Sequence, residues 1–269
     1  MTAPSDGPVN GHDGSEEELL WSVQDGVLEC VLNRSGALNA LTPSLLKTLA
    51  EVVSDVAARP DVRLVAVLGA GGRSFSSGFD LKVLRALGAD AHKGAPLETA
   101  TGVLRDCPKP TIAVVDGYCL GAGMDLAMSC DFRFATPQSR FGVPAIRIGT
   151  VYRPRAIERF VDVLGPTVTK QLFALGRQFE ADQALLAGIV QLVADRDDLM
   201  SAVADWADYK PESATAVQAH KHIVDAFSKT ADRGPEFWEP LDALRQRSVN
   251  SDERKAAVEA FSTTRKEGS

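Results

Sequence analysis

The sequence has 269 residues, and its 36 acidic residues outnumber its 29 basic ones, which gives a formal net charge of −7 at pH 7. Hydrophobic residues make up 45% and charged residues 24% of the chain, a composition typical of a globular protein with a sizeable core. The acidic balance argues against general nucleic-acid binding, which requires a basic surface. No apolar run approaches the roughly 20 residues that span a bilayer, so we expect no membrane partner.

The first residues are small, polar and acidic, which predicts a disordered leader over 1–18. No Lys or Arg precedes Arg34, so the basic start and the apolar segment of a secretory signal are both missing. The expected location is therefore the cytoplasm. Four cysteines occur without a C-x-x-C pair, which predicts reduced, mostly buried thiols and no metal site.

The first predicted elements form a β-hairpin and a helix. Apolar segments at Leu19–Gln24 and Val27–Leu32 flank Asp25-Gly26, a dipeptide typical of two-residue hairpin turns. Thr42 and Pro43 then predict a helix start, because threonine caps helices and proline is favoured at the first helical position. Leucines and valines follow at helical spacing.

Strands and helices alternate along the next part of the chain. Apolar runs at 64–68 and Thr111–Val115 predict buried strands. Further elements are expected as short strands at 132–135 and 140–143 and as helices at 124–128, 154–164, 166–176 and 180–187. From about residue 199 onward, nearly all of the chain is expected to be helical. This order predicts an α/β core over 19–198, followed by a helical region over 199–269.

Two predicted strand-to-helix junctions carry glycines in a pattern that favours a catalytic site. One contains Gly78 and Phe79, and the other contains Gly121, Ala122 and Gly123. Backbone N–H groups at a helix start carry partial positive charge, and two of them aimed at one point form an oxyanion hole. Asp125, one turn into the second helix, would place a carboxylate beside that point, where it could move a proton. Glycines at such junctions also occur for packing alone, so the pattern by itself leaves both interpretations open.

The sequence resembles the enoyl-CoA hydratase/isomerase (crotonase) superfamily, most specifically over 109–149. The resemblance extends from about Leu19 to Lys266, with lesser matches at 39–41, 176–179 and 187–190. It implies a crotonase-like (ClpP/crotonase) α/β fold, a spiral of ββα units with a C-terminal helical region that trimerises. It also implies an acyl-CoA substrate, a homotrimer or hexamer (dimer of trimers), and no cofactor beyond the coenzyme A of the substrate.

The resemblance also implies the catalytic groups. Phe79 and Ala122 match the positions whose backbone N–H groups form the family's oxyanion hole. Asp125 matches the first of the two catalytic glutamates of hydratases, and Ala145 occupies the position of the second. An alanine carries no proton, so this departure bears directly on the reaction.

A second departure supplies candidate substrate contacts. A stretch that is glycine-rich in the family here contains Tyr152 and Arg153, which could offer a phenol and a partner for a substrate carboxylate. The expected substrate-binding residues, from the junctions, this stretch and the coenzyme A end of the site, are Ser77, Gly78, Lys82, Gly121, Ala145, Tyr152, Arg153, Phe261 and Lys266.

The sequence therefore predicts a hydratase-like lyase that stabilises a thioester enolate, in fatty-acid or related acyl-CoA metabolism. Two alternatives stay open because of Ala145. A crotonase-fold decarboxylase or thioester hydrolase needs fewer side-chain acids. A non-catalytic acyl-CoA binder would keep the fold and the carbonyl pocket without turnover.

Overall fold

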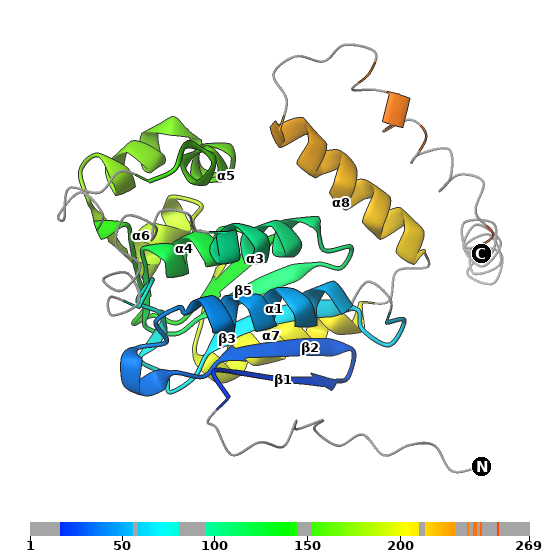
Figure 1. The fold of residues 1–269 in the computed structure, drawn as a ribbon, viewed down its shortest axis with the longest axis horizontal. Helices are drawn as coiled ribbons and strands as arrows, with labels where there is room; N and C mark the ends of the chain where they lie inside the picture. The colour runs from blue at the N-terminus through cyan, green and yellow to red at the C-terminus, as the bar shows by residue number, and fades with distance from the viewer. Residues whose placement is uncertain are drawn as a thin grey trace, which may run out of the picture. The chain divides into compact units, whose positions relative to one another are not determined.

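The computed structural model describes residues 17–55, 59–80, 95–144, 152–209 and 213–229, together with Glu236, Glu239, Pro240, Ala243 and Asp252. The chain divides into two compact units, Met1–Asp208 and Tyr209–Ser269 (Figure 1). Most of the predicted leader, 1–16, lies outside the described residues.

The first unit contains two mixed sheets. The larger sheet has six strands in the order β1 (Leu19–Gln24), β2 (Val27–Leu32), β3 (Leu64–Gly69), β5 (Thr111–Val115), β7 (Phe132–Ala135) and β10 (Leu192–Val193). Only its β1–β2 pair is antiparallel. The smaller sheet has the order β4 (Ser74–Ser76), β6 (Tyr118–Leu120), β8 (Arg140–Gly142) and β9 (Gln178–Glu180), and its β8–β9 pair is antiparallel.

A strand–strand–helix unit recurs along the chain. In each repeat the first strand joins the larger sheet, the second joins the smaller sheet, and a helix follows. The described repeats end in α3 (Ala95–Asp106), α4 (Ala122–Ala127) and α5 (Pro154–Phe173). The predicted α/β class and its ββα units are confirmed.

Local signals explain the first elements. Asp25 and Gly26 have φ values of 51° and 80°, the two positive values that a tight hairpin turn requires, and Gln24 pairs with Val27 across it. Helix α1 (Pro43–Asp55) begins where predicted, because the Thr42 hydroxyl accepts a hydrogen bond of 3.1 Å from the backbone N–H of Leu45.

The larger sheet is covered on both faces. Alternate residues of β3 point to opposite sides, so Val65 and Val67 pack with α1 and α3, whereas Leu64, Ala66 and Leu68 pack with α7 (Arg196–Asp208) (Figure 1). Burial on both faces explains why β3 and β5 are continuous apolar runs. Helix α7 is part of this packing, and the first compact unit extends to Asp208. The predicted division of the chain between 198 and 199 stays a prediction.

The remaining helices differ in detail from the expectations. The helices predicted at 154–164 and 166–176 are the two halves of α5, which is kinked at Gly165, where φ is 70°, just before Pro166. The 3-10 helix η1 (Ser35–Ala37) and the short α6 (Ala181–Leu186) complete the helices of the first unit described here. The second unit contains α8 (Ala214–Lys229); the trimerisation role of this region stays a prediction. Within the described ranges, no helix has the length and apolar character needed to cross a membrane.

Candidate functional site

The two glycine-containing junctions lie against each other. A Cβ placed on Gly78 would lie 3.1 Å from the Leu120 carbonyl oxygen and 3.3 Å from the backbone nitrogen of Ala122. Gly78 and Gly121 have φ values of 99° and 58°, conformations that residues with side chains rarely adopt. Close approach and unusual backbone conformation together require glycine here, which explains the pattern in the sequence.

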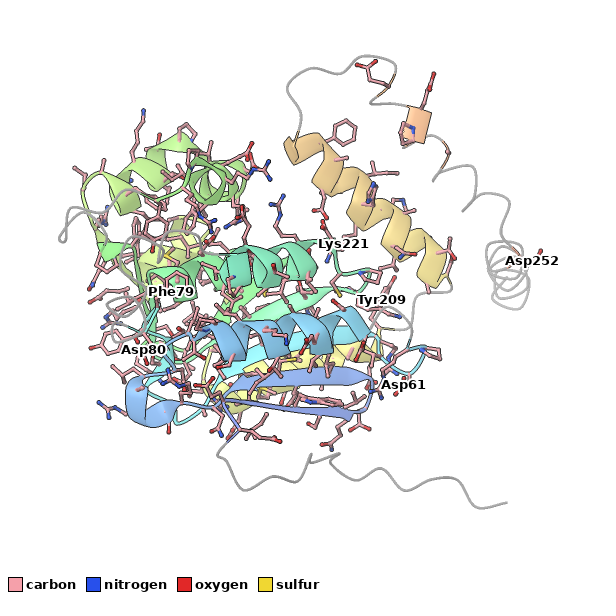
Figure 2. All side chains as sticks on the ribbon, viewed as in Figure 1. Asp61, Phe79, Asp80, Tyr209, Lys221 and Asp252 are labelled. Carbon is pink, nitrogen blue, oxygen red and sulfur yellow. The ribbon has the colours of Figure 1, made fainter. Side chains whose placement is uncertain are left out.

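A single parallel β-bridge orients the backbone of Phe79. The N–H of Leu41 donates to the Gly78 carbonyl (2.7 Å), and the N–H of Asp80 donates to the Leu41 carbonyl (3.0 Å). Because successive peptide groups of an extended strand alternate in direction, the N–H of Phe79 itself points away from Leu41. Phe79 and Asp80 can be followed in Figure 2.

The second predicted donor is the backbone N–H of Ala122, the first residue of α4. The preceding Gly121 is fully engaged, since its N–H donates to the Gly142 carbonyl (2.9 Å) and its carbonyl accepts from Asp125 (3.1 Å). The N–H at the first helical position has no acceptor within the helix. The structure therefore brings the amides of Phe79 and Ala122 to one place, at the contact between the two junctions.

Side chains hold the first junction in position. Asn39 is fully buried, and its side-chain amide donates to the backbone carbonyls of Ser74 (2.6 Å) and Ala70 (2.9 Å). The Arg34 guanidinium forms ion pairs with Asp80 (3.0 Å) and Glu18 (2.9 Å). Within the junction itself, the N–H of Ser77 donates to the Leu38 carbonyl (3.0 Å).

Asp125 forms a buried ion pair that the sequence analysis missed. Asp125 as a residue is 1% exposed, and both of its carboxylate oxygens accept hydrogen bonds from Arg159, Oδ1 at 2.8 and 3.0 Å and Oδ2 at 2.8 Å. Burial raises the pKa of the Asp125 carboxyl, and the charge and hydrogen bonds of Arg159 oppose that rise. The available signal was a charged residue between Ala156 and Phe160 on the buried face of α5, where a guanidinium needs a partner.

Tyr152 reaches the same place from the start of α5. Its hydroxyl oxygen lies 3.4 Å from the position that a Cβ on Gly121 would take. The ring packs edge-on against Phe173, with centroids 5.2 Å apart, and Phe173 packs in the same way on Phe160 at 4.9 Å. Burial raises the pKa of the Tyr152 phenol, and the Asp125 carboxylate raises it further, so the hydroxyl keeps its proton at neutral pH.

Arg153, predicted to meet a substrate carboxylate, is engaged by a side chain of the protein itself. Its Nη1 lies 2.7 Å from Oε2 of Glu98 on α3, and both side chains are about 40% exposed. The substrate-binding role of Arg153 therefore stays a prediction. Four other expected substrate-binding residues lie outside the described residues: Lys82, Ala145, Phe261 and Lys266.

The described part of the chain holds no group of three or more His, Cys, Asp or Glu side chains suited to a metal ion. All four cysteines are buried, as predicted. The described residues of this site offer two main-chain donors, a paired carboxylate and a phenol.

Comparison with known proteins identifies relatives over nearly the whole chain. A family model described as "Enoyl-CoA hydratase/isomerase" matches residues 22–268. A probable enoyl-CoA hydratase of Mycobacterium avium is 35% identical over 211 residues, which cover 76% of this chain and 80% of that protein. A crotonyl-CoA hydratase of Syntrophomonas wolfei is 31% identical, covering 70% and 73% of the two chains. The crystal structure of an enoyl-CoA hydratase/carnithine racemase from Magnetospirillum magneticum superposes with a TM-score of 0.84 at 25% identity, covering 93% of this chain and 94% of the other.

Proposed function

Because the chain belongs to the enoyl-CoA hydratase/isomerase family, we propose that it is an enzyme acting on an acyl-CoA thioester. Its fold is the α/β crotonase fold with two mixed sheets, as the resemblance implied. The substrate's thioester carbonyl binds between the N–H groups of Phe79 and Ala122. The observation that carries this proposal is the contact between the two junctions, with 3.3 Å between the Gly78 Cβ position and the Ala122 nitrogen.

The chemistry follows from where charge develops. Removing a proton or a carboxylate from the carbon next to a thioester, or adding water to a conjugated double bond, places negative charge on the carbonyl oxygen. Two fixed amide donors stabilise that charge without reorganisation, and one such donor is worth about 10²–10³ in kcat. The two glycine-rich junctions supply such donors whatever side chains Phe79 and Ala122 carry.

Asp125 is the proposed acid/base of a hydratase-like reaction, and Arg159 constrains it. A proton arriving at Asp125 would neutralise one half of a buried ion pair and leave the guanidinium without its counter-charge. Together with alanine at 145, this pairing favours a second candidate, a decarboxylase or thioester hydrolase of the same fold. Decarboxylation generates the enolate by loss of carbon dioxide and needs no side-chain base.

The test is mass-resolved product analysis on three classes of coenzyme A ester. Water added to trans-2-enoyl-CoA esters supports the hydratase assignment. Carbon dioxide lost from 2-alkylmalonyl-CoA supports the decarboxylase, and free coenzyme A released from saturated esters supports the hydrolase. Tight binding of esters with no product over hours supports a non-catalytic binder. Absence of both binding and turnover overturns the proposed function.

A further inference from the structure

The Tyr152 hydroxyl lies beside the contact between the two junctions. The Cβ position of Gly121 lies 3.4 Å from that hydroxyl and 3.8 Å from the Cα of Gly78, so the phenol, Gly121 and Gly78 border one small volume. The backbone nitrogen of Ala122 lies 3.3 Å from the Cβ position of Gly78, so it borders the same volume. A thioester oxygen held by the two amides would therefore lie close to the phenol.

Packing fixes where this phenol points. The ring is held edge-on by Phe173 from the far half of α5, beyond the kink, and that ring rests on Phe160 from the near half. Among the described residues, the Tyr152 hydroxyl has no hydrogen-bond partner, and every fully buried side-chain oxygen or nitrogen does have one. The hydroxyl is therefore not fully buried, and a bound ligand can reach it while the ring is held in place.

Asp125 is less suited to delivering a proton from the same region. Both of its oxygens accept hydrogen bonds from Arg159, so any exchange of a proton at Asp125 disrupts a buried charge pair. Tyr152 is the complementary group, because its hydroxyl is neutral and keeps its proton at neutral pH.

We propose that Tyr152 delivers a proton to the α-carbon of the thioester enolate. This inference rests on the proposed function and names the acid for that same site. The O–H bond of Tyr152 breaks, and the enolate electron pair forms the new C–H bond while the carbonyl re-forms. The resulting phenolate then takes a proton from solvent water. The step is the same whether the enolate arises by addition of water or by loss of carbon dioxide.

The test compares Tyr152→Phe with the wild type in deuterium oxide, on trans-2-enoyl-CoA esters and 2-alkylmalonyl-CoA. Phenylalanine keeps the ring packing and removes only the hydroxyl. We expect kcat to fall about 100-fold or more, the usual contribution of a positioned general acid. We also expect the deuterium at the α-carbon of the residual product to lose its preference for one face. Affinity for an unreactive S-alkyl-CoA thioether should stay within about twofold, since the phenol acts on the enolate.

Tyr209→Phe is the matched control, because the Tyr209 side chain is 76% exposed; we expect wild-type turnover. Tyr152→Phe with wild-type rate and stereospecific deuterium overturns the proposal. If Ala122→Pro is inactive in the same assay, the proposed function survives that result. No turnover of any ester by the wild type overturns both.

If Tyr152→Phe fails to fold, fluorotyrosine at position 152 replaces it. Fluorine lowers the pKa of the phenol, so the alkaline limit of kcat must then shift to lower pH, and an unshifted limit overturns the proposal.

Discussion

Asp125 and Arg159 form a buried ion pair, and either charge would be strongly destabilising at this place without the other. Removing water from both charges costs several kcal/mol per ion, and the bidentate geometry, with distances of 2.8 to 3.0 Å, offsets it only while both groups are present. The pair therefore holds the Asp125 carboxylate near the proposed oxyanion site and ties α4 to α5.

Arg159→Met should destabilise the first unit by about 3–5 kcal/mol, because it leaves the Asp125 charge buried without a partner. Urea unfolding followed by circular dichroism measures this. The exposed Arg155 of the same helix supplies the control, and Arg155→Met should change stability by less than about 0.5 kcal/mol. Adding Asp125→Asn to Arg159→Met should recover part of the loss. Equal effects at 155 and 159 would contradict the buried-pair argument.

At this scale the glycine pattern predicted two junctions that meet, but the sequence did not predict the ion pair. The junctions were recognisable because glycines are local signals, whereas the donor roles of Phe79 and Ala122 come from the family resemblance and stay predictions. Arg159 was not, because its partner is 34 residues away in the sequence and only the packing of α5 brings the two together. The position of the Tyr152 phenol has the same cause, since it depends on the fold of α5 around its kink.

A proline substitution at Ala122, the first residue of α4, tests its backbone N–H group. Proline is tolerated at the first helical position, so Ala122→Pro should preserve the helix while it replaces the N–H donor with a ring carbon. Under the proposed function, kcat should fall about 10²–10³-fold. Ala122→Gly retains the N–H and should stay within about tenfold of wild type. Steady-state kinetics on the ester that the wild type turns over measures both, and a fully active Ala122→Pro would remove Ala122 from the oxyanion site.

Gly123 determines how closely α4 approaches β4. A Cβ there would lie 2.6 Å from the Ser76 Cβ and 2.7 Å from the Ser76 carbonyl oxygen, which is backbone and has little room to move. Gly123→Ala should therefore cost about 1–3 kcal/mol and lower activity by separating the junctions. Gly102→Ala on α3 is the control, because nothing lies within 4 Å of its Cβ position. It should stabilise the protein by about 0.5–1 kcal/mol in thermal unfolding. Equal melting temperatures for the two variants would contradict this.

Elements with local signals were the most predictable. The first hairpin has the predicted bounds because Asp25-Gly26 specifies the turn, and α1 begins at its predicted cap. The packing of α7 with the first unit was harder to predict from the sequence. Helix α7 belongs to it through Leu199, Val203 and Ala207, whose contacts are with strands distant in the sequence.

Across the first unit, Glu18 links the beginning of β1 to α1 and to the Phe79 junction. Its carboxylate accepts from the hydroxyls of Thr42 (2.6 Å) and Ser44 (2.5 Å) and pairs with Arg34, which also holds Asp80. Partial burial raises the pKa of Glu18, but these hydrogen bonds and the Arg34 charge outweigh it, so the net pKa is lowered.

A lowered folded-state pKa means that the unfolded chain takes up the proton more readily as pH falls. The stabilisation by Glu18 is therefore complete above the ordinary glutamate value of 4.5 and is lost as pH falls through the lowered pKa. Glu18→Gln should lower the melting temperature at pH 7, and the gap to wild type should close on acidification below 4.5. Glu51→Gln, at an exposed position on α1, should show little difference at either pH. A gap for Glu18→Gln that is constant with pH would contradict the argument.

Main-chain donors have a consequence for how this protein diverges from its relatives. Under the proposed function, the groups that stabilise the enolate belong to the main chain, so at positions 79 and 122 a substitution that fits the surrounding core should keep activity, whereas proline should not. Substitutions that lower activity should instead concentrate at the neighbouring glycines that shape the backbone, Gly78, Gly121 and Gly123. The side chain of Ala122 is buried in the core and that of Phe79 packs against it, so neither is free to follow a new acyl group. Under the proposed function, substrate range would change through other residues around the site, while the charge-stabilising backbone is inherited intact.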